Sequence, residues 1–432
     1  MKILKHWIFW VLLGIALVPI LLKLSGVMQR IFELEIVPFA WIGLYWFVFC
    51  VALSIKAAKN SRAKLIYAYV SALPLCLSLG EVWGYVRDSQ TASNAQCHPQ
   101  TSGTYNSEYF TPDSITGYKA KPNVRATSLK KNDDEVLYDV SYTSNDFGYR
   151  HTPNSNTDSK HCLLFFGDSF TIGEGVNDDQ TLPYFLNQHA QFKVFNFGFH
   201  GYGNHQALAL LKSGEVARIT QGCKEYIAFY ESLPGHIQRA NGFSPWEDLN
   251  APRFTLAGDT LLWKNQHKNL WDKIANKIFL QLDKKSYLFK LTRPKYAYDE
   301  RYNALYFAIL DEIDMALHTQ FGTGLHFILW DSNNLSNETE ITESNAITAW
   351  LENQNFKWFL VSEILPQYTK NRLQYGLHQC DTHPNALANE LIAKFLAHKI
   401  DSGEIATRPA HTTRESHPTH TTTPAQEARD VE

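Results

Sequence analysis

The feature that most constrains the fold is a regular alternation of short apolar segments with helical patterns. Segments typical of buried strands lie at 162–167, 192–197, 224–230, 325–330 and 356–361. Helices are expected near 181–189, 204–218, 301–318, 341–353 and 385–399. Strands that are apolar along their whole length and alternate with helices are typical of a parallel sheet with both faces covered. The sequence therefore predicts a three-layer α/β domain.

Two stretches before this domain have a different character. Residues 89–112 are rich in Ser, Thr, Asn and Gln, which favours a linker. Residues 113–150 contain short strand patterns such as 136–143, ended by the turn-prone Ser144-Asn145-Asp146. We expect this second stretch to be a β-rich entry module.

Two further segments depart from the alternation. Residues 241–300 form an insertion that contains Trp246, Trp263 and Trp271. It is either a lid or substrate wall, or a structural excursion that packs its own Trp residues. The tail at 401–432 is rich in Thr, His and Pro without an apolar pattern, and we expect it to be disordered.

The first part of the chain is strongly apolar. Runs at 7–27, 36–55 and 65–83 predict three transmembrane helices within residues 1–88. The short loop between the second and third runs is basic, with Lys56, Lys59, Arg62 and Lys64. Such loops stay cytoplasmic, so everything after Trp83 is expected outside the cytoplasm, anchored at a bacterial inner membrane. The alternative is a helical hairpin buried in a soluble protein.

Cysteine placement fits an exported domain. Cys50 and Cys76 lie in the apolar runs, whereas the other four cysteines follow them. Strands expected to be parallel neighbours begin at Cys162 and just after Cys223, so we favour a disulfide between these two and a second between Cys97 and Cys380. Four buried free thiols are the alternative.

Charge excludes one class of partner. The formal net charge is -3, and the central region has no long basic stretch, so no nucleic-acid partner is expected.

The first chemical signal is Gly167-Asp168-Ser169, which ends an apolar strand just before a helix. Open α/β sheets place reactive groups at the carboxyl ends of their strands. The N–H of Ser169 could stabilise an oxyanion near the positive end of the following helix. Asp and Ser are also ordinary turn and helix-cap residues, so this triplet alone decides nothing.

The second signal is the glycine-rich segment 196–203, which follows the second strand. The N–H of Gly201 could be a second oxyanion donor. The glycine spacing is not that of a dinucleotide-binding loop, so no nucleotide cofactor is expected. His200 and His205 lie in or near this segment and could line the pocket, but we expect each to be a polar surface residue.

The third signal is Asp381-Thr382-His383-Pro384, before the last expected helix. His383 could accept the proton of Ser169 and return it to a leaving group, while Asp381 holds its other ring nitrogen. Each signal is weak alone, but the three together in one α/β domain favour a catalytic site.

These motifs resemble those of the SGNH/GDSL hydrolase superfamily. The similarity includes Gly167-Asp168-Ser169-Phe170, Gly201 and Asp381 with His383-Pro384. Upstream, the segments 116–118, 121–123 and 144–150 look like the lead-in of membrane-tethered members among bacterial envelope and polysaccharide enzymes. The resemblance covers about 113–400. It implies a flavodoxin-like fold, no metal or other cofactor, and transfer of an acyl group from an ester.

The chain departs from the family pattern at two places. The third block normally offers an Asn as oxyanion donor, but residues 230–236 contain none, so Ser232 or His236 is the candidate substitute. Loss of one such donor typically costs ~10²–10³ in rate. The acid also precedes His383 by two residues instead of three, and Asp331 is the alternative orienting residue.

The resemblance and the motifs together predict a membrane-anchored serine esterase. Ser169 would attack an ester, with His383 and Asp381 as partners and Ser169, Gly201 and Ser232 as oxyanion donors. The expected substrate is an O-acyl group of an envelope carbohydrate. The alternatives are an O-acyltransferase to a polysaccharide, a lipid esterase or lysophospholipase, and a non-catalytic scaffold that assists a membrane acyl-donor partner.

Overall fold

The computed structural model describes residues 38–56, 61–94, 97–188, 191–243, 251–264, 278, 282, 285–292, 298–331, 338–406 and 408–409. The chain divides into two compact units. The first comprises residues 1–100, 132–135 and 267–297. The second comprises the remainder and contains the α/β domain.

The second unit is built on a parallel sheet with the strand order β12-β11-β8-β6-β7. The strands are β6 (His161–Phe166), β7 (Lys193–Asn196), β8 (Glu225–Ser232), β11 (Leu325–Leu329) and β12 (Lys357–Leu360). This is the flavodoxin-like order: β7 lies on one side of β6, and β8 and the later strands lie on the other. In such sheets, ligands bind at the carboxyl ends of the strands where the order reverses. The five predicted strands and the fold class are confirmed.

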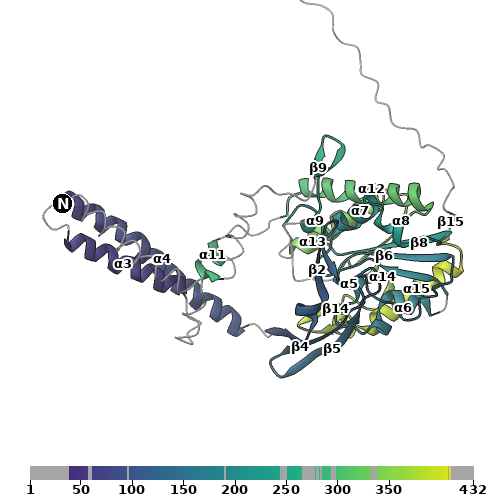
Figure 1. Ribbon diagram of the computed structural model, residues 1–432, viewed down its shortest axis with the longest axis horizontal. Helices are drawn as coiled ribbons and strands as arrows, with labels where there is room; N and C mark the ends of the chain where they lie inside the picture. The colour runs from purple at the N-terminus through teal and green to yellow at the C-terminus, as the bar shows by residue number, and fades with distance from the viewer. Residues whose placement is uncertain are drawn as a thin grey trace, which may run out of the picture. The chain divides into compact units, whose positions relative to one another are not determined.

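Helices cover both faces of the sheet (Figure 1). One face carries α7 (Asn204–Lys212), α8 (Glu215–Ile219), α9 (His236–Ala240), α12 (Arg301–Phe321) and α13 (Glu338–Leu351). The other face carries α6 (Leu182–Asn187), α14 (Val361–Ile364) and α15 (Ala386–Asp401). The single helix expected at 204–218 is two helices, because Gly214 adopts a left-handed φ of 77° between them.

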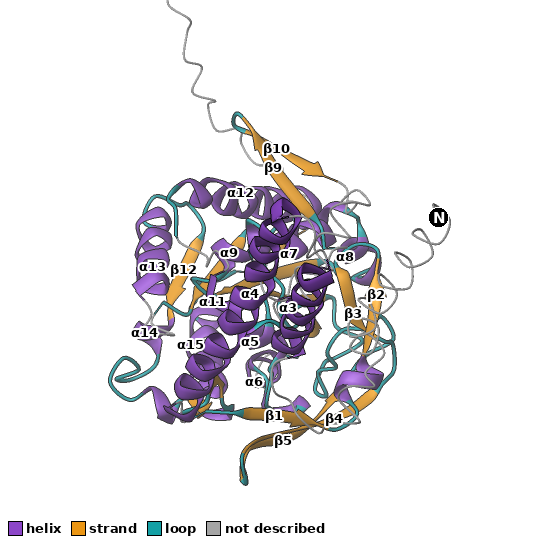
Figure 2. Cartoon of the chain, turned by 90° about the vertical axis from the view of Figure 1, so that its left-hand side faces the viewer, coloured by secondary structure: helices purple, strands orange, loops and turns teal. Residues whose placement is uncertain are grey.

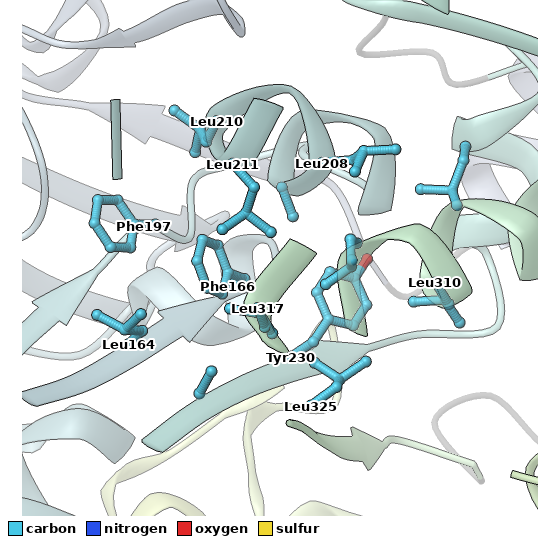
Figure 3. Packing of buried hydrophobic residues seen from close by; sticks show 14 of the residues in the cluster. Leu164, Phe166, Phe197, Leu208, Leu210, Leu211, Tyr230, Leu310, Leu317 and Leu325 are labelled. Carbon is cyan, nitrogen blue, oxygen red and sulfur yellow. The ribbon is translucent and has the colours of Figure 1, made fainter. Parts of the chain in front are cut away.

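The core has two parts because side chains alternate along each buried strand. Leu164 and Phe166 of β6 pack with the α7 side, whereas Leu163 and Phe165 pack with the α15 side. Figure 3 shows the first part, where Phe166 stacks on Phe197 with ring centroids 5.2 Å apart. Burial of each such side chain stabilises the fold by about 1.5–3 kcal/mol.

A disulfide joins the amino ends of two neighbouring strands. Cys162 of β6 and Cys223, which precedes β8, are bonded with their Cα atoms 6.0 Å apart. This predicted pair is confirmed. The second predicted pair, Cys97 with Cys380, stays a prediction.

The entry module contains the hairpin β2 (Phe110–Asp113) and β3 (Gly117–Ala120), and a sheet of order β1-β4-β5. The strands of that sheet are β1 (Pro99–Ser102), β4 (Arg125–Asn132) and β5 (Glu135–Thr143). The predicted strand at 136–143 is confirmed. The prediction that residues 89–112 form a linker is wrong. Tyr105 and Tyr109 lie in a π-helical turn and are buried, with Tyr105 against Tyr142 and Tyr109 against Phe199.

Part of the insertion is a β-hairpin, β9 (Arg253–Ala257) and β10 (Thr260–Lys264), which Figure 2 shows extending from the helical layer. Phe254 enters the core, and Trp263 stacks on its ring at 5.8 Å between centroids. This hairpin is anchored by its own aromatic packing, as the structural alternative expects. Trp246 and Trp271 lie outside the described residues.

The predicted tail begins too early. Beyond α15, Ile405 is buried, and the short strand β15 (Arg408–Pro409) pairs antiparallel with the start of β8. Described secondary structure therefore extends to Pro409, and residue 407 and residues 410–432 lie outside the described part.

The first unit contains the helices α3 (Pro38–Lys56) and α4 (Ser61–Asn94), with α11 (Tyr287–Thr292) from the insertion. Glu81 of α4 accepts hydrogen bonds from the hydroxyl of Ser286 and, at 2.8 Å, from the N–H of Tyr287. Among the described helices, none combines the length and the apolar character that crossing a membrane requires. The spans expected at 36–55 and 65–83 are thus not supported, and the run at 7–27 lies outside the described residues.

Candidate active site

Ser169 stands on a sharp turn between β6 and the short helix α5 (Ser169–Ile172). Gly167 makes the turn with a φ of 150°, and a Cβ there would lie 2.0 Å from Oγ1 of Thr171 and 2.7 Å from the carbonyl oxygen of Glu231. Only glycine fits this position. Asp168 caps α5, because its Oδ1 accepts from the N–H of Phe170 at 3.0 Å. Ser169 is therefore fixed at the carboxyl end of β6.

The three predicted triad residues come together. The hydroxyl of Ser169 lies 2.9 Å from Nε2 of His383, and Nδ1 of His383 lies 2.5 Å from Oδ1 of Asp381. Asp381 and His383 both belong to β14 (Asp381–Pro384), which pairs with β13 (Gly376–His378). The side chain of His383 is 20% exposed, so solvent reaches the site.

Asp331, the alternative orienting residue, has another role. Its Oδ1 accepts from the N–H of Ser362 at 3.0 Å, at the start of α14. Of the two candidate orienting residues, Asp381 is therefore the one whose carboxylate contacts His383.

Two charged residues that we did not predict complete the site. Glu174 follows the nucleophile turn, and its Oε2 lies 2.7 Å from Nδ1 of His200 and 3.5 Å from Nε2 of His383. Lys130 of β4 places its Nζ 2.7 Å from Oδ2 of Asp381 and 3.8 Å from Oε1 of Glu174. The Gly-Glu-Gly sequence at 173–175 was a usable signal for Glu174, whereas nothing local distinguishes Lys130 from other lysines.

These charges shift the ionisation of every member. Burial alone would lower the pKa of His383, but Glu174 and Asp381 outweigh it and raise the pKa to about 9. Burial opposes ionisation of Glu174, yet His383, His200 and Lys130 lower its pKa to about 2. The pKa of Asp381 lies well below its usual range because His383 and Lys130 outweigh its burial. The site therefore keeps both carboxylates ionised around a basic imidazole.

The same groups are close enough to hold a cation. One ligand atom from each of Glu174, Asp381 and His383 lies within 4.8 Å of the others. The ammonium of Lys130 already faces both carboxylates, and Nε2 of His383 is directed at Ser169. This donor set suits proton transfer by His383.

The loop after β7 packs against the nucleophile turn. The N–H of Phe199 donates to the carbonyl of Gly167 at 3.4 Å, and a Cβ on Gly198 would lie 2.6 Å from Cβ of Thr171. Gly201 follows in this loop with a left-handed φ of 73°. The oxyanion roles of the N–H groups of Ser169 and Gly201 stay predictions.

Two histidines of this loop region are not the surface residues that we expected. Nδ1 of His200 contacts Glu174, and its ring packs against that of Tyr105. His205 is only 4% exposed at the start of α7, where burial and nearby cationic groups keep its pKa well below the usual value.

Ser232 is wrongly predicted as an oxyanion donor. Its hydroxyl is fully buried, 2.7 Å from Oη of Tyr306 and 3.2 Å from Nδ1 of His236. The helix α12, which carries Tyr306, covers this end of β8. Ser232 is therefore part of a buried hydrogen-bond network.

Side chains of the segment after β8 contact the carboxylate of Asp168. Nε2 of His236 lies 3.1 Å from Oδ2 of Asp168, and Nη1 of Arg239 lies 2.6 Å from the same oxygen. Burial opposes ionisation of Asp168, but Arg239 and His236 keep its pKa well below the usual range. His236 thus acts on the turn that carries Ser169, in the block where the family pattern has an Asn.

Solved structures similar to this chain include two bacterial proteins. A protein from Desulfitobacterium hafniense DCB-2, described as lipolytic and of the G-D-S-L family, is 14% identical with a TM-score of 0.32, over 56% of this chain and 100% of that one. A member of the same family from Veillonella parvula DSM 2008 is 13% identical with a TM-score of 0.31, over 54% of this chain and 94% of that one. Both belong to the superfamily that the motifs resemble.

No protein-family model matches this chain, and no curated protein does. Because identity and TM-score are low for the two solved structures, the function is inferred from the residues of this chain.

Proposed function

We propose that the chain is a serine esterase whose nucleophile is Ser169. The observation that carries the proposal is the continuous line of hydrogen bonds from Ser169 through His383 to Asp381. Separate segments of the chain supply the hydroxyl, the imidazole and the carboxylate in the order that acyl transfer needs.

The geometry supports a two-step reaction. His383 Nε2 accepts the proton of Ser169 as Oγ attacks the ester carbonyl, and Asp381 stabilises the imidazolium that forms. Collapse of the tetrahedral intermediate transfers that proton to the leaving alcohol and leaves an acyl-serine. A second hydroxyl group then gives its proton to His383 as it attacks the acyl group, and the bond to Oγ of Ser169 breaks as His383 returns the proton to that oxygen.

The identity of that second hydroxyl separates two activities. Water gives an esterase, and a sugar hydroxyl gives an O-acyltransferase. Our first choice is hydrolysis of an O-acyl group on an envelope carbohydrate, with transfer to a polysaccharide as the runner-up. A lipid ester is the next alternative. A scaffold of the same fold is disfavoured, because it would need no aligned Ser169, His383 and Asp381.

We also propose that the domain works outside the cytoplasm. The disulfide between Cys162 and Cys223 supports this, because structural disulfides persist in oxidising compartments. Attachment to a membrane through the apolar run at 7–27 and an acyl-donor partner in the membrane stay predictions from the sequence.

Hydrolysis of p-nitrophenyl esters by the purified full-length chain tests the proposal. We expect release of nitrophenol that is abolished in Ser169→Ala and reduced in His383→Asn. Acetyl esters should be preferred over long acyl chains for a carbohydrate esterase, and the reverse preference would favour a lipid ester. Equal rates for Ser169→Ala and the parent protein would overturn the proposed nucleophile.

A further inference from the structure

His383 lies between two carboxylates, of which the mechanism above uses only one. Asp381 contacts Nδ1, and Glu174 faces Nε2 from 3.5 Å, on the side where Ser169 also lies. The ammonium group of Lys130 forms ion pairs with both carboxylates. The four groups form a closed ring of alternating charge, and nothing in the two-step reaction itself requires Glu174.

The loop that carries Glu174 is unusually well fixed. The guanidinium of Arg150, itself buried, donates to the carbonyl oxygens of Gly173 at 3.3 Å and Val176 at 2.9 Å, one on each side of Glu174. The N–H of Gly175 donates to Oη of Tyr142 at 2.9 Å. The backbone N–H of Glu174 donates to the carbonyl of Ser169 at 2.8 Å. The carboxylate and the nucleophile therefore belong to one rigid turn.

Both glycines beside Glu174 are required by this turn. Gly173 and Gly175 have left-handed φ values of 81° and 79°. A Cβ on Gly175 would lie 2.1 Å from Cδ1 of Leu377 in β13, which pairs with the strand that carries His383. Glycine thus allows the loop to approach the segment that carries the imidazole.

His200 anchors the carboxylate from the other side. Its Nδ1 lies 2.7 Å from Oε2 of Glu174, and its ring lies 5.1 Å from that of Tyr105 and 6.0 Å from that of Tyr142. Its peptide oxygen accepts from the hydroxyl of Tyr118 at 2.6 Å. The entry module and the loop after β7 therefore hold Glu174 in position.

We propose that Glu174 is a positioning residue for His383, holding the imidazole beside Ser169 and setting the pH range in which it can accept the Ser169 proton. The proposal rests on the esterase function proposed above and deepens it. Glu174 acts on the reaction through His383, whose Nε2 lies 3.5 Å from its Oε2. A carboxylate that faces Nε2 stabilises the imidazolium, both in the resting site and when Ser169 attacks.

The charged and titratable groups around His383 come from several elements. They are Asp381 from β14, Lys130 from β4, Tyr138 from β5, Glu174 from the nucleophile turn and His200 from the loop after β7. The two carboxylates raise the pKa of His383 to about 9, against the effects of burial and Lys130. Removal of the Glu174 charge should therefore lower this pKa and leave a weaker base.

The first test is the pH dependence of kcat/KM for p-nitrophenyl acetate, with the full-length chain and Glu174→Gln. We expect the acidic limb of the profile to move to lower pH by one unit or more. Below both limbs, each unit corresponds to a roughly tenfold gain for the variant, because the rate follows the fraction of neutral imidazole. At high pH the variant should be slower than the parent protein, because its imidazolium is less stabilised.

Glu225→Gln is the matched control. Glu225 also pairs with a histidine, His161, at 2.9 Å between Oε2 and Nδ1, but it lies at the amino end of β8. Its profile should superimpose on that of the parent protein. An unshifted profile for Glu174→Gln would overturn the proposal.

A titration that needs no turnover separates this proposal from the proposed function. The imidazole resonances of His383 are followed by ¹⁵N NMR in Ser169→Ala and in Ser169→Ala with Glu174→Gln, and His383→Asn assigns them. We expect the second protein to titrate at lower pH. Equal titration of the two proteins overturns the role of Glu174. A shift between them, together with a parent protein that hydrolyses no ester, overturns the proposed function and keeps the role of Glu174.

Discussion

The ammonium group of Lys130 lies 2.7 Å from the carboxylate of Asp381, although 251 residues separate them in the chain. Asp381 thus has a cation on one oxygen and the imidazole of His383 on the other. A strand of the entry module therefore contributes directly to the candidate site of the α/β domain. Lys130 holds the orienting carboxylate ionised and in place.

Asp381→Asn should lower kcat for p-nitrophenyl acetate by about 10³–10⁴, since an amide neither stabilises the imidazolium nor selects the required tautomer of His383. Lys130→Met should have a smaller effect on kcat, because Asp381 keeps its hydrogen bonds to the ring and to the N–H of His383. Steady-state kinetics on both variants checks this order. A larger loss in Lys130→Met than in Asp381→Asn would contradict it.

The pH dependence of the parent protein follows from His383. Its pKa is raised from 6.5 to about 9, so kcat/KM should rise with pH up to about 9. The same shift in pKa lowers the stability of the fold as the pH rises, whereas it raises the activity. A histidine whose folded pKa is raised contributes stability that is fully present below 6.5 and is lost as the pH rises through about 9. Activity profiles and urea titrations between those values measure both effects, and a profile that is level at and above pH 7 would contradict the first.

Gly167→Ala should destabilise the fold by about 2–4 kcal/mol, because its Cβ would meet the carbonyl oxygen of Glu231 in a strained backbone conformation. Gly214→Ala is the matched control. Its φ is also positive, at 77°, but no atom lies within 4 Å of the added Cβ, so the substitution should cost only about 1–2 kcal/mol. Urea denaturation compares the two, and equal losses would mean that the close contact at Gly167 relaxes at little cost.

Glu231 provides a stability test away from catalysis. Burial raises its pKa to about 7, although Thr171 and Trp330 donate to its two oxygens at 2.8 and 2.7 Å. A carboxyl whose folded pKa is raised contributes stability below its ordinary pKa and loses it as the pH rises through about 7. Glu231→Gln should therefore gain Tm relative to the parent protein as the pH increases from 6 to 8. A constant difference in Tm over that range would contradict this account of Glu231.

The disulfide between Cys162 and Cys223 closes a loop of 61 residues. Replacement of both cysteines by Ser should lower the free energy of unfolding by about 2–4 kcal/mol. Cys50→Ser with Cys76→Ser is the control, because both of these cysteines are free. Denaturation with and without reductant measures the difference, and a parent protein that is insensitive to reductant would contradict a stabilising role.

The features that could be predicted from the sequence are those encoded by a local pattern of residues. Each strand of the parallel sheet contains a mainly apolar run, and the glycine at 167 has a backbone conformation that other residues rarely adopt, so both could be recognised in the sequence. Ser169, Asp381 and His383 could be proposed from the sequence because each follows a strand or precedes a helix in a motif, and the structure brings their side chains together.

What the sequence did not predict depends on contacts between distant segments. Lys130 reaches Asp381 only when the entry module packs on the α/β domain, and Glu174 faces His383 only when β14 lies beside the nucleophile turn. Ser232 was misread because its burial depends on Tyr306, which lies on a helix 74 residues away. No local periodicity carries such information.

The measurement that tests the central claim most directly is covalent labelling of the full-length chain with a fluorophosphonate, followed by peptide mass spectrometry. An activated serine forms a stable phosphonyl ester with this probe, whereas an ordinary buried hydroxyl does not. The account predicts one adduct, on Ser169, formed faster as the pH approaches 9 and nearly lost in His383→Asn. A folded protein that gives no adduct, or an adduct on another serine, would contradict it.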